Sequence, residues 1–284
     1  MKIRFIAEIG ANHNKNLKRC RSLIDKAQDC GFTDIKFQLF DTEKLISKNT
    51  KSFYKKNFKI FKKFELPKKF IPIISKYCKK KRIKFGCSVF GIEDITYLKK
   101  YVNFFKISSY DILRKDLITL SAKTRKPIII STGASKLNEV SNAVKSAKKG
   151  KTKNISILHC VSNYPTEEKN CNLKSIKFLR KKFKLKTGWS DHTVNPLLIY
   201  SAIKNHGAEI IEMHFDLDKK GNEFNSGHCW TPKESFDLIT YIKNEKKIDG
   251  KLSKKLAKSE HFERVFKSDP SDGMRPLIKF RDKI

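Results

Sequence analysis

Short apolar runs alternate with longer amphipathic segments along almost the whole chain. The apolar runs are rich in isoleucine and phenylalanine, and runs of this length between polar segments are typical of buried strands. The segments between them carry apolar residues at helical spacing. We expect strands at residues 3–9, 33–39, 83–88, 103–108, 127–131, 155–160, 185–189 and 209–213. We expect helices at residues 17–30, 67–79, 91–100, 112–124, 137–149, 172–182, 196–206 and 232–246.

This alternation predicts an α/β fold, a (β/α)8 TIM barrel with a short C-terminal tail. We assign residues 1–250 to the barrel and 251–284 to the tail. An open doubly wound sheet is the competing fold, but it would more often carry a GxGxxG turn, and the chain has none. The lysine-rich segment 41–65 is too long for an ordinary connection, so we interpret it as a lid or binding loop.

The formal charge of +34 would ordinarily suggest a nucleic-acid or membrane partner. Lysine outnumbers arginine 53 to 10, however, and the lysines are spread over nearly every expected helix, which favours a solvated surface without a specific nucleic-acid or membrane partner. The seven cysteines form no CxxC pair, and no run approaches the ~18 apolar residues of a membrane span. We therefore expect a cytoplasmic protein without a disulfide framework.

In a TIM barrel the C-terminal ends of all strands meet at one mouth, where the chemistry takes place. Lys36 and Lys106 lie inside expected strands, and an unpaired buried ammonium is costly. Each could form an internal salt bridge. Together with the serines at neighbouring strand ends, they favour a pocket for a small anion that carries phosphate or carboxylate groups.

Two histidines, His192 and His214, follow adjacent expected strands. A single histidine at a strand end is more often a hydrogen-bonded structural residue than a ligand. Two of them, beside Asp191 and Glu212, make a site for a divalent metal plausible. His159 and His228 are weaker candidates, and His206 and His261 are interpreted as surface residues.

Several segments together resemble sialic acid synthases, the N-acetylneuraminate synthase family. The segments are IAEIGANHN at 6–14, KFQ at 36–38, FKISS at 105–109, STG at 131–133, HC at 159–160 with YP at 164–165, GWSDHT at 188–193 and EMHF at 212–215. The resemblance covers residues 3 to 236. It implies a metal-dependent condensation of phosphoenolpyruvate with an open-chain N-acylated hexose, which gives a nine-carbon 2-keto-3-deoxy sugar acid and phosphate.

The resemblance also implies roles for individual residues. The residues expected to hold phosphoenolpyruvate are Lys36, Ser88, Lys106, Ser109, Ser131 and Ser190. Those expected near the sugar are Gln38, Asp111, Ser162 and Tyr164, with Glu8 as partner of a metal-bound water or a sugar hydroxyl. His192 and His214 are expected to hold manganese, with Mg²⁺ or Co²⁺ as alternatives, in a homodimer. The catalytic set is then Glu8, Lys36, Lys106, His192 and His214.

Departures from the family pattern leave the acceptor open between N-acetylmannosamine and a di-acetamido relative. Residues 221–227 replace a Gly-Pro-Asp segment, Ser162 stands where many members have asparagine, and Tyr110-Asp111 replaces a Gly-Glu pair. Members usually continue into a small antifreeze-like domain that lends an arginine to the sugar site. We expect that domain to be absent here and Arg275 to replace its arginine. Another phosphoenolpyruvate-dependent sugar acid synthase and a non-catalytic sugar-binding barrel are the alternative functions.

Overall fold

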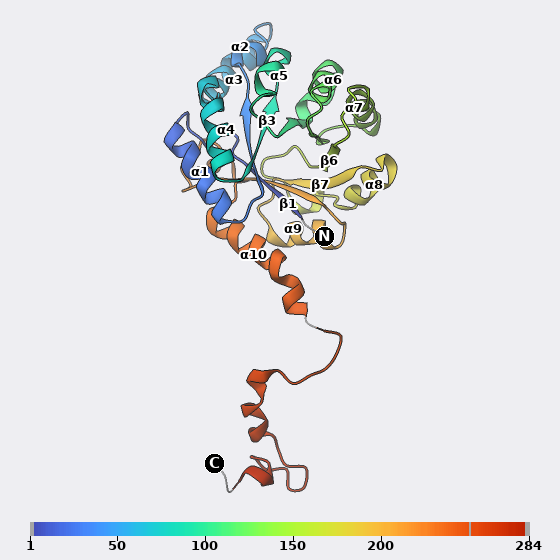
Figure 1. The fold of residues 1–284 in the computed structure, drawn as a ribbon. Helices are drawn as coiled ribbons and strands as arrows, with labels where there is room; N and C mark the ends of the chain where they lie inside the picture. Colours follow the sequence, from blue (N-terminus) through green and yellow to red (C-terminus); the bar gives the residue numbers. More distant parts are fainter. Residues whose placement is uncertain (1–2, 250, 282–284) are drawn as a thin grey trace. The chain divides into compact units, whose positions relative to one another are not determined.

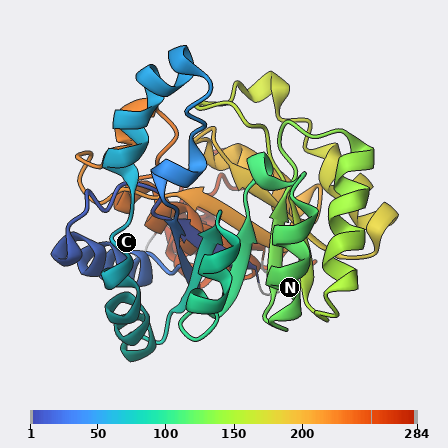
Figure 2. The same ribbon diagram turned by 90° about the horizontal axis from the view of Figure 1, so that it is seen from above.

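The computed structural model of the chain describes residues 3–249 and 251–281. Its first part is a closed barrel of eight parallel strands in sequential order, surrounded by helices (Figures 1 and 2). The strands are β1 (Arg4–Glu8), β2 (Asp34–Leu39), β3 (Lys84–Val89), β4 (Phe104–Ile107), β5 (Ile128–Ser131), β6 (Ile155–His159), β7 (Lys186–Asp191) and β8 (Ile210–His214). The predicted TIM barrel is confirmed.

The α-helices are α1 (Leu17–Asp29), α2 (Thr42–Leu45), α3 (Lys51–Phe64), α4 (Ile71–Lys80), α5 (Ile92–Leu98), α6 (Lys115–Lys123), α7 (Leu137–Lys149), α8 (Lys174–Phe183), α9 (Pro196–Lys204) and α10 (Pro232–Asp249). The 3-10 helices are η1 (Lys68–Phe70), η2 (Ser109–Asp111), η3 (Glu168–Asn170), η4 (Phe224–Ser226), η5 (Lys258–Glu260), η6 (Phe262–Phe266) and η7 (Ile278–Phe280). Side-chain caps start some helices: Asn16 accepts from the Arg19 amide before α1, and Asn195 from the Leu197 amide before α9.

Alternation along each strand sorts its side chains between two environments. Odd-numbered residues of β1, such as Phe5, face the helices and join the main hydrophobic core. The next residue, Ile6, points into the barrel, where it joins a second apolar cluster. That cluster consists of Ile6, Phe104, Ile129, Leu158 and Ile210. This cluster fills the interior of the barrel as one layer of side chains. The next inward-facing residue along each strand lies above this layer, nearer the mouth.

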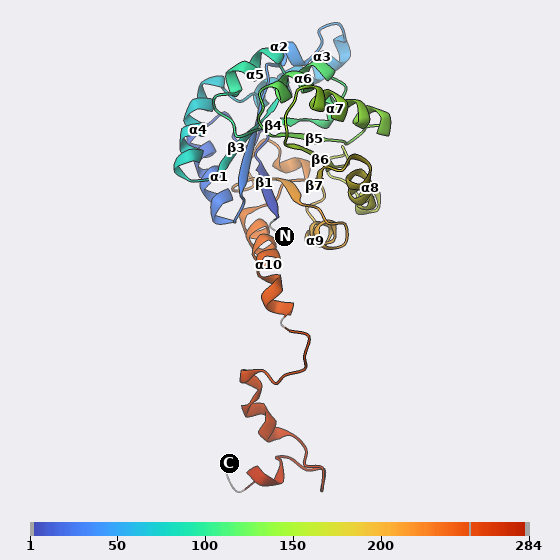
Figure 3. The same ribbon diagram turned by 45° about the vertical axis from the view of Figure 1, so that its right-hand side comes forward.

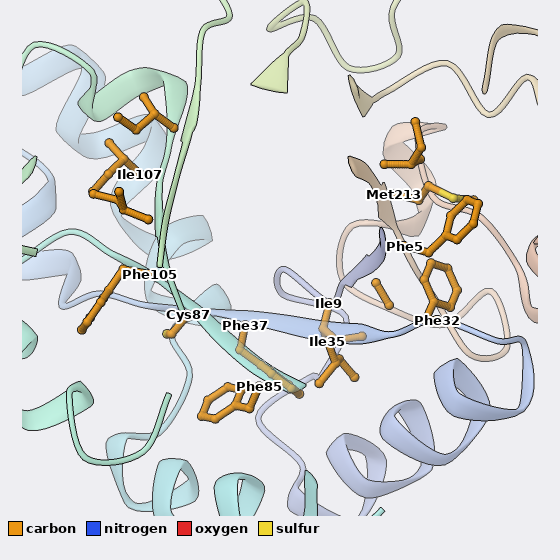
Figure 4. Packing of buried hydrophobic residues seen from close by; sticks show 14 of the residues in the cluster. Phe5, Ile9, Phe32, Ile35, Phe37, Phe85, Cys87, Phe105, Ile107 and Met213 are labelled. Carbon is orange, nitrogen blue, oxygen red and sulfur yellow. The ribbon is translucent and has the colours of Figure 1, made fainter. Parts of the chain in front are cut away.

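Gly86 of β3 makes room for this layer. A Cβ atom at Gly86 would lie 2.0 Å from the ring of Phe104, so only glycine leaves space for that ring inside the barrel. On the outer face of the barrel, strand residues such as Phe37 and Phe85 pack their aromatic rings between the sheet and the helices. The centroids of these two rings are 6.0 Å apart (Figure 4). Each fully buried ring contributes about 2 kcal/mol to stability.

The segment 41–65 is not an irregular loop, because most of it forms α2 and α3. Its role as a lid or binding segment stays a prediction. Figures 1 and 3 show both helices beside α5. The Asp41 side chain caps α2, and the Phe61 ring of α3 lies 6.2 Å from that of Phe40. Aromatic residues at helical spacing gave α3 an apolar face that packs on the barrel, and that contact favours a helix over an irregular loop. Helix α3 has no fully buried residue, so it packs on the barrel only through partly exposed side chains.

The chain forms two compact units, Met1–Lys243 and Asn244–Ile284. In the second unit, the Arg281 guanidinium forms a salt bridge with Asp272, with Nη2 donating to Oδ1 at 2.8 Å. Arg275 donates to the Ser268 hydroxyl at 3.2 Å. Helices in the described part of the chain are all too short or too polar to cross a lipid bilayer.

Candidate active site

A cavity of about 180 Å³ opens at the C-terminal ends of the strands. Most of the predicted site residues line it, namely Glu8, Lys36, Gln38, Ser88, Lys106, Ser109, Ser131, Tyr164, Ser190, His192 and His214. Ser162 lies just behind this lining, with its hydroxyl 2.9 Å from that of Ser109. Asp111 is buried in η2 but does not line the cavity. Arg275 belongs to the second unit, and its contact with sugar stays a prediction.

The two predicted lysines are buried and face the cavity. Lys36 Nζ lies 2.7 Å from Glu8 Oε2 and donates to Ser88 Oγ at 2.9 Å. Lys106 Nζ lies 3.0 Å from Glu212 Oε1. Burial disfavours the ammonium, but Glu212 and Glu8 outweigh it and raise the pKa of Lys36. Each lysine is therefore salt-bridged and also available to an anion in the cavity.

Glu212 sits at the centre of this network, although we did not include it among the site residues. Its Oε1 atom accepts from Lys106 and from Ser190 Oγ at 3.1 Å, and Lys36 Nζ is 3.8 Å away. Burial favours the neutral acid, but the ammoniums of Lys106 and Lys36 outweigh it and hold the pKa of Glu212 well below its usual range. The carboxylate is ionised and balances the lysines.

Glu8 Oε2, which is salt-bridged to Lys36, is one of three buried oxygens at the cavity that have no hydrogen-bond partner in the described part of the chain. The two without a salt bridge at hydrogen-bond distance are Ser131 Oγ and Glu212 Oε2. Nearly all buried polar atoms in proteins are paired, and an unpaired one costs about 1–3 kcal/mol. Both atoms lie in residues that line the cavity. A polar ligand or water would satisfy them there.

The two predicted metal histidines lie side by side, with ring centroids 5.4 Å apart. His192 Nδ1 donates to the Val161 carbonyl at 2.7 Å, and His214 Nδ1 donates to Glu223 Oε2 at 3.1 Å. The described residues provide no hydrogen-bond partner for either Nε2 atom. Metal-binding histidines are oriented in this way, with one nitrogen held by an oxygen and the other left for the metal. Burial and the neighbouring His214 lower the pKa of His192 to about 3, so its ring is neutral and able to bind.

Glu223 is held by the turn that follows β1. The Ala11 amide donates to Glu223 Oε1 at 2.8 Å, and the Glu223 amide donates to Asn12 Oδ1 at 2.8 Å. Gly10 has a positive φ of 52°, and a Cβ atom there would lie 2.1 Å from Glu223 Oε2. Burial favours the neutral acid, but His214 outweighs it and lowers the pKa of Glu223. The turn thus fixes a carboxylate that orients His214.

His228 joins the same cluster. It is buried, and its ring centroid lies 4.4 Å from that of His214 and 6.1 Å from that of His192. His214, Glu223, His228 and Cys229 each offer one donor atom, and these atoms all lie within 4.8 Å of one another. Nitrogen and carboxylate donors at this spacing fit a divalent transition metal. These four residues thus fit a divalent metal at His214, and the predicted ligand His192 is not one of them.

Two other candidates have structural roles. His159 Nε2 donates to the Cys171 carbonyl at 2.8 Å, which accounts for its burial. Asp191, which we expected beside the metal, instead accepts from the indole nitrogens of Trp189 and Trp230, each at 2.9 Å. That expectation is wrong, because β7 continues through Asp191 and alternation turns its side chain away from His192.

The outer wall of the cavity is aromatic. The Tyr164 ring packs against His192 at a centroid distance of 4.2 Å. Four apolar side chains close another part of the lining, namely Phe40, Leu45, Phe61 and Phe90. The volume of about 180 Å³ is below the roughly 300 Å³ at which ligand pockets usually begin. A ligand larger than one small anion would therefore have to extend past this wall or displace it.

Comparisons with known proteins identify the family of this chain. The model of the NeuB family matches residues 23–254. The chain belongs to the NeuB family. An uncharacterized protein of Methanocaldococcus jannaschii is 36% identical over 246 residues, which is 86% of this chain and 71% of that protein.

Relatives with assigned names are sugar acid synthases. The N,N'-diacetyllegionaminic acid synthase of Campylobacter jejuni is 34% identical, over 90% of this chain and 80% of that protein. A crystal structure of N-acetylneuraminic acid (sialic acid) synthetase from Leptospira borgpetersenii serovar Hardjo-bovis, in complex with citrate, is 32% identical with a TM-score of 0.80, covering 93% of this chain and 90% of that one. The prediction of a synthase of this family is confirmed.

Sequence reasoning on this NeuB chain did not identify Glu223 and ranked His228 only as a weaker candidate. Both lie in the connection after β8, which ends at the mouth, and this position was the available signal. Strand periodicity cannot place a connection, because its path depends on contacts with residues distant in sequence. Here those contacts come from the 10–14 turn. Its Ala11 amide, which donates to the Glu223 carboxylate, lies 212 positions earlier in the sequence.

Asp111 allows a prediction about stability. Its carboxyl is 7% exposed, and burial raises its pKa from 3.8 to about 6. The folded state therefore keeps the proton that the unfolded state loses, and stability falls as pH rises from about 4 to 6. We expect Asp111→Asn to stabilise the protein by on the order of 2 kcal/mol at pH 8 and little at pH 3.5.

Urea unfolding at the two pH values measures this difference. Asp116→Asn is the matched control, because Asp116 lies in the same region but is exposed and has a lowered pKa through the Leu117 amide. The control should give no gain at pH 8. Equal effects of Asp111→Asn at both pH values would contradict the assignment of the buried acid.

Proposed function

We propose that the chain condenses phosphoenolpyruvate with an open-chain N-acylated hexose to give a nine-carbon 2-keto-3-deoxy sugar acid and phosphate. The observation that carries this proposal is the pairing of two buried lysines with two free imidazole nitrogens around one cavity. Family membership supports the reaction class. In this reaction, carbon 3 of phosphoenolpyruvate bonds to the aldehyde carbon, water adds at carbon 2, and the carbon–oxygen bond to phosphate breaks.

The lysines and hydroxyls would bind phosphoenolpyruvate. Lys36 and Lys106 supply two positive charges, and the unpaired Ser131 hydroxyl can donate to a phosphate or carboxylate oxygen. Glu8 and Glu212 hold both ammoniums in place before the substrate enters. Such preorganised charges in a buried site stabilise the anion without further rearrangement.

His192 and His214 would hold the divalent metal. When bound, such a cation acts as a Lewis acid on the aldehyde oxygen of the sugar. Glu223 keeps the His214 ring in place through Nδ1, and the Val161 carbonyl does the same for His192. Glu8 Oε1 accepts from Gln38 Nε2 at 2.6 Å, so this carboxylate lies where it can accept a proton from a water or a sugar hydroxyl.

The acceptor that the site favours is a di-acetamido hexose. The wall of Phe40, Leu45, Phe61 and Phe90 offers apolar contacts that suit acetamido methyl groups better than hydroxyls. Two relatives named as N,N'-diacetyllegionaminic acid synthases, at 34% and 31% identity, support the same choice. N-acetylmannosamine carries one such methyl group and would bind this wall less well.

The test is to incubate the protein with phosphoenolpyruvate, Mn²⁺ and either sugar, following phosphate release and the mass of the product. We expect turnover with both, with kcat/KM about tenfold or more higher for the di-acetamido sugar. Lys106→Met should lower phosphate release about a thousandfold, whereas Lys115→Met, at an exposed position, should not. If no acceptor gives phosphate while the metal binds, the barrel is a non-catalytic sugar-binding protein.

A further inference from the structure

We infer that His228 is a further metal ligand, so that the cation is held by three imidazoles and not by the predicted pair alone. This inference rests on the proposed function, which places a divalent metal at His192 and His214. The three rings form one cluster, with centroid distances of 4.4, 5.4 and 6.1 Å. A bound metal lies about 2.1 Å from each histidine nitrogen that holds it. The separation of 4.4 Å places the His228 ring next to His214, and His192 is the more distant of the two.

One nitrogen of the His228 ring is available for a ligand. It is only 4% exposed, and its Nδ1 atom has no hydrogen-bond partner in the described part of the chain. A buried nitrogen in that state costs about 1–3 kcal/mol. A ligand that accepts its lone pair removes this cost. His214 offers a donor atom within 4.8 Å of one on His228, so both rings can bind the same cation.

The connection after β8 is built to bring His228 to this place. Phe215 and Trp230 form a bridge on either side of the connection, with the Trp230 amide donating to the His214 carbonyl at 2.7 Å. The side chain of Asn12 donates to the Phe215 carbonyl at 3.1 Å and to Cys229 Sγ at 3.4 Å. These contacts close the loop, and the His228 ring lies edge-to-face with His214 at a centroid distance of 4.4 Å.

Three imidazoles change which metals bind. Imidazole ligands favour Co²⁺ and Zn²⁺ over Mn²⁺, and Mg²⁺ prefers oxygen ligands. We therefore expect the protein to bind Co²⁺ more tightly than Mn²⁺, and Mg²⁺ poorly. Cys229 also offers a donor atom, but its sulfur already accepts the bond from Asn12, so we assign it to positioning of the loop.

The experiment measures metal affinity directly. Metal-free protein is titrated with Co²⁺, followed by its visible absorption and by calorimetry. We expect His228→Asn to weaken Co²⁺ binding about 10- to 100-fold, because lost or disordered ligands have effects of that size. His206→Asn is the matched control, since His206 lies outside the cluster, and it should leave affinity unchanged. Cys229→Ser should retain the Co²⁺ affinity of the wild type. The Co²⁺ spectrum of the wild type should contain no sulfur-to-cobalt charge-transfer band, because Cys229 is not a ligand.

A second measurement needs no variant. Pulsed EPR of the wild-type protein loaded with Mn²⁺ detects the coordinated imidazole nitrogens, and we expect three rings. Two rings, or an unchanged Co²⁺ affinity in His228→Asn, would overturn the assignment of His228. Such an outcome would leave the proposed function intact, because phosphate release by the wild type is measured separately. Absence of phosphate release with metal bound to three rings would reject only the proposed reaction.

Discussion

Replacing His214 with alanine is expected to abolish metal-dependent turnover, lowering phosphate release at least about a thousandfold. A bound cation contributes several kcal/mol to the transition state, and about 1.4 kcal/mol corresponds to a factor of ten. His214 is the ring that every other group of the cluster adjoins, including His192, Glu223 and His228. Its loss also leaves the Glu223 carboxylate without its imidazole partner. His192→Ala should have an effect of the same order.

The fold should survive both changes, because the barrel core lies below the mouth and contains neither ring. Phosphate release with phosphoenolpyruvate and Mn²⁺ measures activity, and far-ultraviolet circular dichroism measures folding. His206→Ala, outside the cluster, should keep full activity. Near-normal turnover in His214→Ala would show that the chemistry does not depend on this ring.

Replacing Asp191 with alanine is expected to destabilise the protein by about 4 kcal/mol, the largest stability effect we predict. Its carboxylate is fully buried and accepts four hydrogen bonds. They come from Trp189 Nε1 at 2.9 Å, Thr193 Oγ1 at 2.7 Å, Trp230 Nε1 at 2.9 Å and the Val194 amide at 3.0 Å. Without the acceptor, two buried indole groups lose their partner, and each unsatisfied donor costs about 1–3 kcal/mol.

Urea unfolding at neutral pH measures this change. Thr193→Val is the matched control: it removes one of the four donors and the acceptor of the Asn195 amide, and it should cost about 1–2 kcal/mol. Asp191→Asn should fall between the two, because an amide oxygen still accepts from one indole. A loss below about 1 kcal/mol in Asp191→Ala would mean that these bonds contribute little. Metal affinity should change less than in His228→Asn, because Asp191 points away from the cluster.

The sequence by itself determined the barrel and the inner layer of the site. Lys36 and Lys106 lie within expected apolar runs, and His192 and His214 follow two others, so the barrel brings all four to the mouth. These positions follow from local chemistry, because a strand sends successive side chains to opposite faces whatever its neighbours are. The quoted segments were likewise enough to recognise the family, which the match over residues 23–254 confirms.

Only the tertiary structure decided how the charges are balanced and what surrounds the metal histidines. Glu212 compensates Lys106 from 106 positions away, and alternation cannot show which inward groups touch across the barrel. The turn near Ala11 fixes Glu223, and closure of the loop at Trp230 brings His228 to His214. Connections and lids follow long-range contacts and not a local period, so their residues become assignable only when the chain is folded.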